Sequence, residues 1–211
     1  SYLNAAISLL LPYLEPYLIR TMRSARAEVT DEALLRDLDA FSAQEGQHYR
    51  QHVAFNELLR ARGLGDLEDL EREVAEDYQR FSKTRSLRFN LAYAEGFEAM
   101  ALTIGHMLIE DREHLFAGGE SSVASLVLWH FVEEIEHKSA TYDVFKALDG
   151  RYVWRIYGLL FAMVHIMGRT RQGYRALLLE DGLWRSWSSR LALWRLLGRI
   201  FARLIPRLLR I

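Results

Sequence analysis

Apolar side chains recur at intervals of three and four residues along almost the whole chain, and strand-like alternation is absent. This spacing predicts an all-α fold. Pro12 and Pro16 suit an opening turn, and Thr30-Asp31-Glu32 suits the cap of the next helix. Gly150 suits a helix end, and the last helix should be interrupted or end near Pro206. Helices are expected over about 12–27, 30–62, 66–81, 84–114, 121–148, 151–180 and 183–210.

Composition narrows the class of protein further. The 211 residues allow a sizeable core, and only 3 prolines and 13 glycines argue against a turn-rich or disordered chain. The chain has no cysteine, which excludes disulfides, zinc fingers, iron–sulfur clusters and thiol nucleophiles. Any metal must therefore be bound by histidines and carboxylates.

The net charge of -1 conceals an uneven distribution of charge. Residues 1–150 carry a net charge of -11, whereas residues 151–211 hold twelve arginines and two acids, a net charge of +10. Two parts are predicted: an acidic helical body over 1–150, and basic amphipathic helices over 151–211 packed on or beside it.

The sequence Glu-x-x-His occurs twice, as Glu45 to His48 and as Glu134 to His137. At a spacing of i and i+3, a carboxylate and an imidazole project from one helix face and can bind the same metal. One such motif arises easily by chance on a charged helix. Two of them, on different predicted helices, indicate a repeated helical hairpin.

Each of these helices follows a helix that carries a glutamate among apolar residues, Glu15 in LLPYLEPYLI and Glu95 in LAYAEGFEAMAL. One Glu from each of two helices and one Glu-x-x-His from each of two others is the ligand set of a two-metal carboxylate centre in a four-helix bundle. Four carboxylates neutralise two divalent cations, so none remains buried without a partner. The alternative is that Glu45, Glu134 and the two histidines lie on solvated surfaces.

Further polar residues fall near the same faces. His52 is one turn after His48, and His130 is one turn before Glu134, so each would be an additional ligand or a supporting hydrogen-bond partner. Glu98 and Glu133 are candidates for the same roles. The segment 63–83 is long enough for the crossover that a ferritin-like bundle requires.

The chain resembles the bacterial family of predicted metal-dependent hydrolases, ferritin-like proteins of largely unassigned activity. The resemblance rests on QEGQHYRQH (44–52), on the helix around Glu95 and on WHFVEEIEHKSATYDVF (129–145), and it covers about residues 12–180. It implies metal binding by the following residues: Glu15, Glu45, His48, Glu95, Glu134 and His137, with His52 and His130 also matching. Family members typically have Gly before the first of these glutamates and His after the third, where this chain has Leu14 and Gly96.

A carboxylate-rich site with two histidines suits two ions, Fe/Fe or Fe/Mn. This ligand spacing favours an oxidase or oxygenase that activates dioxygen, uses an electron donor and acts on an apolar or aromatic small molecule. A cytoplasmic location is expected, because no stretch is long and apolar enough to span a bilayer. Two alternatives are retained. One is a hydrolase that uses a bridging hydroxide, as the family name suggests, and the other is iron oxidation and storage.

The basic end of the chain has a pattern of its own. Arginines recur every fourth residue on one helix face, at Arg195, Arg199, Arg203 and Arg207, beside Trp194. This pattern suits peripheral contact of 183–211 with the inner face of an anionic membrane, or packing against the body or a second subunit in a homodimer. Nucleic acid is not expected, because no aromatic platform alternates with the arginines. The start of the chain has no features of a signal peptide.

Overall fold

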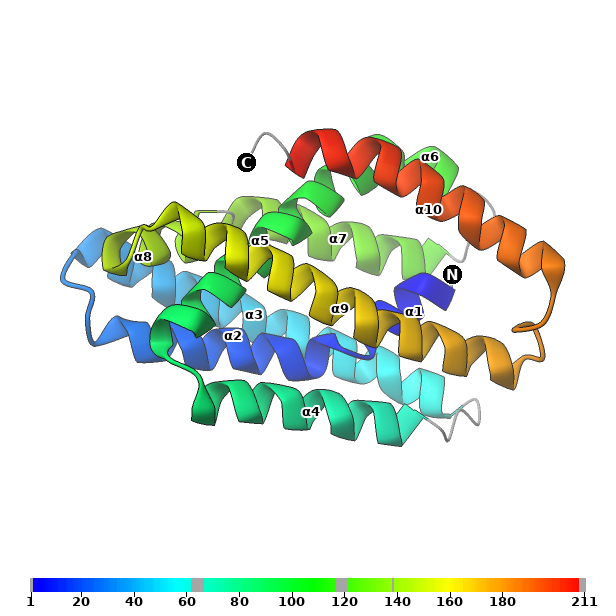
Figure 1. The fold of residues 1–211 in the computed structure, drawn as a ribbon, viewed down its shortest axis with the longest axis horizontal. Helices are drawn as coiled ribbons and strands as arrows, with labels where there is room; N and C mark the ends of the chain where they lie inside the picture. Colours follow the sequence, from blue (N-terminus) through cyan, green and yellow to red (C-terminus); the bar gives the residue numbers. More distant parts are fainter. Residues whose placement is uncertain (1, 62–66, 117–120, 138, 209–211) are drawn as a thin grey trace.

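The computed structural model describes residues 2–61, 67–116, 121–137 and 139–208. Within these ranges, eight side chains lie outside the description: His114, Ser122, Val123, Glu136, His137, Leu204, Arg207 and Leu208. All regular structure in these ranges is helical, which confirms the all-α prediction (Figure 1). The helices are α1 (Tyr2–Ser8), α2 (Leu11–Arg26), α3 (Glu32–Arg60), α4 (Leu67–Thr84), α5 (Leu87–Glu110), α6 (Arg112–Leu115), α7 (Ser121–His137), α8 (Ala140–Leu148), α9 (Tyr152–Glu180) and α10 (Trp187–Leu208).

Several boundaries follow the expected local chemistry. Asp31 caps α3 by accepting hydrogen bonds from the backbone N–H groups of Ala33 and Leu34, at 2.7 and 3.1 Å. Gly150 has a φ of 66°, a left-handed conformation that ends α8 and that glycine adopts without strain.

Other boundaries differ from the prediction. The helix expected over 121–148 is two helices, α7 and α8, and α1 was not expected. The last helix begins at Trp187 rather than 183, because a turn at Gly182 (φ 67°) closes α9 and the Ser186 hydroxyl accepts from the Ser189 N–H. Pro206 lies inside the final described turn of α10, which ends at Leu208.

Helices α2, α3, α7 and α5 contact one another in a ring, each packing on the next. α4 returns the chain along the molecule after α3, so α5 starts at the same end as α3 and runs in the same general direction (Figure 1). α7 then runs against α3. This topology turns one face of each of the four helices towards a shared interior.

α9 crosses the outer side of α5 at two glycines. A Cβ atom at Gly158 would collide with the backbone oxygen of Ala92, and one at Gly96 would collide with the backbone of Leu159. The two helix backbones are therefore in direct contact, which only glycine permits at both positions.

A network of charged groups fastens α9 to α4 beside this crossing. The Asp77 carboxylate accepts hydrogen bonds from Arg169 Nε at 2.8 Å and from His165 Nε2 at 3.1 Å, and Arg80 donates to its other oxygen at 2.6 Å. His165 Nδ1 lies 2.8 Å from the Tyr93 hydroxyl, in the aromatic core. Within the described residues, no helix is long and apolar enough to cross a membrane.

Candidate metal centre

Four glutamates from four different helices lie buried in the interior between α2, α3, α5 and α7. They are Glu15, Glu45, Glu98 and Glu134, each at most 4% exposed. Three imidazoles accompany them, those of His48, His52 and His130, each at most 7% exposed. Ionisable groups are rarely buried so completely unless they are paired or bind a metal.

Several carboxylate oxygens in this interior have no hydrogen-bond partner among the described residues. They include both oxygens of Glu15, and one oxygen each of Glu45, Glu98 and Glu134. A buried carboxylate without a compensating group costs several kcal/mol, roughly, in free energy of folding. A bound cation would supply the missing partner, so the residues present fit a metal site.

His48 is oriented by a carboxylate outside the cluster. Its Nε2 lies 3.1 Å from Glu133 Oε2, and because a carboxylate only accepts, Nε2 carries the proton. Its Nδ1 lies 3.4 Å from Glu45 Oε1 and 3.5 Å from Glu134 Oε1. Between Nδ1 and two carboxylates there must be either a second proton or a cation, and the hydrogen bond to Glu133 is the kind that orients metal-binding histidines.

The tautomer of His52 follows from a second set of hydrogen bonds. Asn56 Nδ2 donates to the Ser8 carbonyl at 2.9 Å, so Asn56 Oδ1 accepts from the Ser8 hydroxyl at 3.0 Å. The Ser8 oxygen then accepts from His52 Nδ1 at 2.8 Å. The lone pair of His52 is therefore on Nε2, which faces Glu15 Oε1 at 3.9 Å and His130 Nδ1 at 3.3 Å.

His130 continues this series of hydrogen bonds to Glu134. Its Nδ1 donates to His52, while its Nε2 lies 3.2 Å from Glu134 Oε1. Here too a proton or a cation must lie between the nitrogen and the carboxylate. Two sets of residues could each hold an ion, with the ligand atoms of each set within 4.8 Å of one another. They are Glu45, His48 and Glu134 in one set, and Glu15, His48 and His130 in the other.

Crowding of carboxylates shifts their protonation equilibria. Burial, and then the charge of Glu134, raise the pKa of Glu45 to about 7. Burial followed by neighbouring carboxylates also raises the pKa values of Glu15 and Glu98 well above their ordinary range. Burial opposes ionisation of Glu134 as well, but the hydrogen bond with His130 and the charges of His130 and His48 lower its pKa to about 2. Without metal, the cluster therefore retains protons that a cation would displace.

On α5, Glu98 rather than Glu95 lies with the other carboxylates. Besides burial, the charges of Glu134, Glu45 and Glu15 raise the pKa of Glu98. Glu95 Oε1 instead accepts a hydrogen bond from Arg155 Nε of α9 at 2.7 Å. Its other oxygen is buried without a hydrogen-bond partner among the described residues, so the ligand role of Glu95 stays a prediction.

The remaining predicted residues are His137 and those of the basic end of the chain. The side chain of His137 lies outside the described residues, as does that of Arg207. Arg199 and Arg203 both contact Asp111 at the end of α5, at 2.6 and 3.4 Å, and Arg195 is exposed. Trp194 is 70% exposed.

Sequence reasoning missed three residues: Ser8 and Asn56, in the hydrogen-bond network of His52, and Arg155, the partner of Glu95. Ser8 lies in the unexpected helix α1, and Arg155 lies in the part of the chain predicted to be separate from the bundle. Asn56 gave a usable indication, because it lies one turn after His52 and two after His48 on the same face of α3.

Compared with known protein families, residues 1–211 match the family described as "predicted metal-dependent hydrolase". Comparison with curated proteins gave no match, and comparison with solved structures gave none either. The match extends over every residue of the sequence and agrees with the resemblance carried by the two Glu-x-x-His segments. The chain therefore belongs to the family of predicted metal-dependent hydrolases.

Proposed function

We propose that this protein is a metal-dependent hydrolase whose metal centre lies between α2, α3, α5 and α7 in a ferritin-like bundle. The observation that carries the proposal is the buried cluster of four carboxylates and three imidazoles, with carboxylate oxygens that lack partners among the described residues. Membership of the hydrolase family supports the same reaction class.

The two sets of ligand atoms suggest which residues would bind each ion. Glu45, Glu134 and His48 Nδ1 would hold one ion, and Glu15 with His130 would hold a second close to it. Glu98 would complete the carboxylate set. When bound, divalent cations would lower the pKa of a water molecule and polarise the carbonyl or phosphoryl group of a substrate.

Glu133 connects this centre to the surface on α7. Its side chain is 25% exposed, and it positions His48 through the hydrogen bond to Nε2. Trp129, 36% exposed, has its ring centroid 5.5 Å from that of His48, and Val132 is 45% exposed. An apolar or aromatic small molecule with a hydrolysable bond would approach the centre across this apolar part of α7.

Dioxygen activation by two iron ions, or by iron and manganese, is the second candidate. The repeated order of Glu and Glu-x-x-His favours it, because oxygen-activating carboxylate centres use this order of ligands. In that case an external electron donor would be needed.

One experiment separates the two reactions. The metal content of the isolated protein is measured, and an aryl ester and an aryl phosphate are then offered in anaerobic buffer. A hydrolase should cleave at least one of them without oxygen and should lose this activity with a chelator. The His48→Ala variant should lack the activity. If neither is cleaved and the reduced protein consumes oxygen, the second candidate replaces the first.

A further inference from the structure

The outer side of α9 carries a line of exposed apolar side chains. Val153, Tyr157, Leu160, Val164 and Met167 follow one another at steps of four and three residues, with exposed fractions from 42% at Tyr157 to 78% at Val153. These steps keep the line on one face of the helix. In Figure 1, α9 lies in front of α5, so this face points away from the rest of the molecule.

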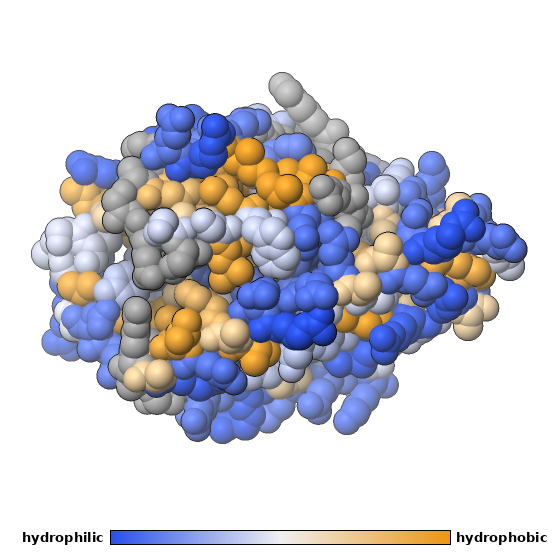
Figure 2. All heavy atoms as spheres, turned by 180° about the vertical axis from the view of Figure 1, so that it is seen from behind, coloured by the Kyte–Doolittle hydropathy of each residue, from blue (hydrophilic) through white to orange (hydrophobic). Residues whose placement is uncertain are grey.

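α10 continues the exposure of apolar groups. Trp187 is 82% exposed, Trp194 70%, Leu191 51% and Ile205 50%. Of the fifteen large apolar side chains exposed in the described part of the chain, eleven belong to residues 152–205. α9 and α10 meet at the turn over 181–186, and both lie towards the viewer in Figure 1. On the opposite face, apolar patches are interrupted by hydrophilic residues (Figure 2).

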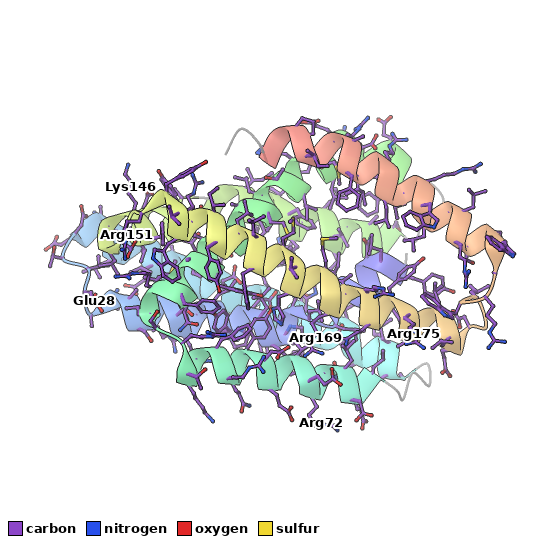
Figure 3. All side chains as sticks on the ribbon, viewed as in Figure 1. Glu28, Arg72, Lys146, Arg151, Arg169 and Arg175 are labelled. Atoms are coloured by element: carbon purple, nitrogen blue, oxygen red, sulfur yellow. The ribbon has the colours of Figure 1, made fainter. Side chains whose placement is uncertain are left out.

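The same segment carries the excess of positive charge, +10 over residues 151–211. Carboxylates of the body neutralise part of it, at Arg155, Arg169, Arg199 and Arg203. Lys146 and Arg151 lie near one end of α9, Arg175 lies near the other, and Arg169 lies between them (Figure 3). Beside Val164 the surface is hollowed by about 620 Å³. This hollow is lined by Arg80, Arg169, Arg171, Arg175 and Gln172, with Asp77 as the acidic residue in its wall.

We propose that the face formed by α9 and α10 docks on the surface of a bilayer that contains anionic lipids. Tryptophan and tyrosine, with an apolar ring and a polar edge, suit the boundary between head groups and acyl chains. Arginines flanking an apolar stripe bind anionic head groups, and the basic hollow offers a place for a lipid phosphate. A second copy of this face would bring arginines against arginines, so an anionic surface is the better complement.

The test uses flotation of the full-length protein with vesicles of phosphatidylcholine, with or without one quarter phosphatidylglycerol. The protein should float with the anionic vesicles at 50 mM salt, much less at 300 mM, and little with phosphatidylcholine alone, because head-group attraction is screened by salt. Inorganic phosphate at 10 mM should leave flotation nearly unchanged if the face formed by α9 and α10 binds a lipid surface rather than free phosphate.

Two variants address the two kinds of contact. Replacing Trp187 and Trp194 by serine should abolish flotation, and Arg171→Gln with Arg175→Gln should weaken it by about fivefold for each arginine removed. Replacing Tyr49 and Leu58, exposed apolar residues of α3, by serine is the matched control and should change nothing. Helix content by circular dichroism verifies that each variant is folded.

Three results would overturn the proposal. They are the absence of flotation with anionic vesicles, equal flotation of the tryptophan variant and the native protein, and a stable dimer that the tryptophan variant splits while lipid has no effect. The last result would assign the face to contact between protein chains.

Discussion

Arg155 Nε donates a hydrogen bond to Glu95 Oε1 at 2.7 Å, and both side chains are largely buried, 19% and 2% exposed. The arginine comes from α9 and the glutamate from α5, and they meet because the two helices cross in contact at glycines. A carboxylate predicted as a metal ligand is thus neutralised in part by a residue from the basic end of the chain.

Glu98→Gln and Glu95→Gln should therefore have different effects. Glu98→Gln should lower the metal content of the protein, because Glu98 lies with Glu134 and Glu45. Glu95→Gln should keep the metal but lower the free energy of unfolding by about 3 kcal/mol, since it leaves Arg155 without this buried partner. Metal analysis and urea unfolding of both variants check this, with exposed Glu57→Gln as control. Loss of metal in Glu95→Gln alone would restore Glu95 as the ligand.

The helix crossing itself is tested with alanine. Gly158→Ala should lower the free energy of unfolding by at least about 2 kcal/mol, because the new methyl group collides with the backbone of α5 at Ala92. Gly168, on the same helix, has open space where its Cβ would be. Gly168→Ala should therefore stabilise the protein by about 0.5–1 kcal/mol. Thermal unfolding of both variants measures the contrast, and equal effects would contradict the contact.

Ser8→Ala should weaken metal binding although Ser8 is not a ligand. Without the hydroxyl, His52 Nδ1 loses its acceptor, the lone pair is no longer fixed on Nε2, and the hydrogen bond that orients the proposed ligand His130 is weakened. Loss of such a supporting hydrogen bond typically lowers metal affinity 10–100-fold, roughly. Titration with Mn²⁺ or Fe²⁺ under anaerobic conditions measures the change, and Ser24→Ala, an exposed serine on α2, is the control. Unchanged affinity in Ser8→Ala would mean that the tautomer of His52 has no influence on the site.

Metal binding should release protons. The pKa of Glu45 is about 7, so this group is largely protonated at pH 6.5, and burial also raises the pKa values of Glu15 and Glu98 well above their ordinary range. Affinity should rise with pH through 7, because cations compete with fewer protons as the carboxylates ionise. Calorimetry in two buffers of different ionisation enthalpy counts the protons. Binding without proton release at pH 6.5 would contradict the protonated cluster.

Asp77 should contribute to stability in a pH-dependent way. Burial raises its pKa, but hydrogen bonds from His165 and Arg169 bring it below the ordinary value of 3.8. Because the pKa is lower in the folded state, the stabilisation is present above pH 4 and is lost as pH falls through the folded-state pKa. Asp77→Asn should cost about 3 kcal/mol at pH 7 and progressively less in acid. Asp69→Asn, whose side chain is 75% exposed, should cost less than about 1 kcal/mol at either pH.

Much of the fold and part of the site could be predicted from sequence. Periodicity located the long helices because each has a continuous apolar face, and the repeated motif identified Glu15, Glu45, His48 and Glu134. Glu95 and Glu98 are one turn apart, and periodicity does not show which of them faces the carboxylate cluster. That depends on the position of Arg155 on α9, whose guanidinium group binds Glu95. The same limit applies to Ser8 and Arg155, whose partners are 44 and 60 residues away in sequence.

The contact between Gly96 and Gly158 also limits how this fold can vary. A Cβ atom at Gly96 would meet the backbone of α9, and one at Gly158 would meet the backbone of α5. A larger residue at either position would push α9 away from α5 and draw Arg155 away from Glu95. The two glycines therefore control the charge that reaches the interior from α9 as well as the packing of the two helices.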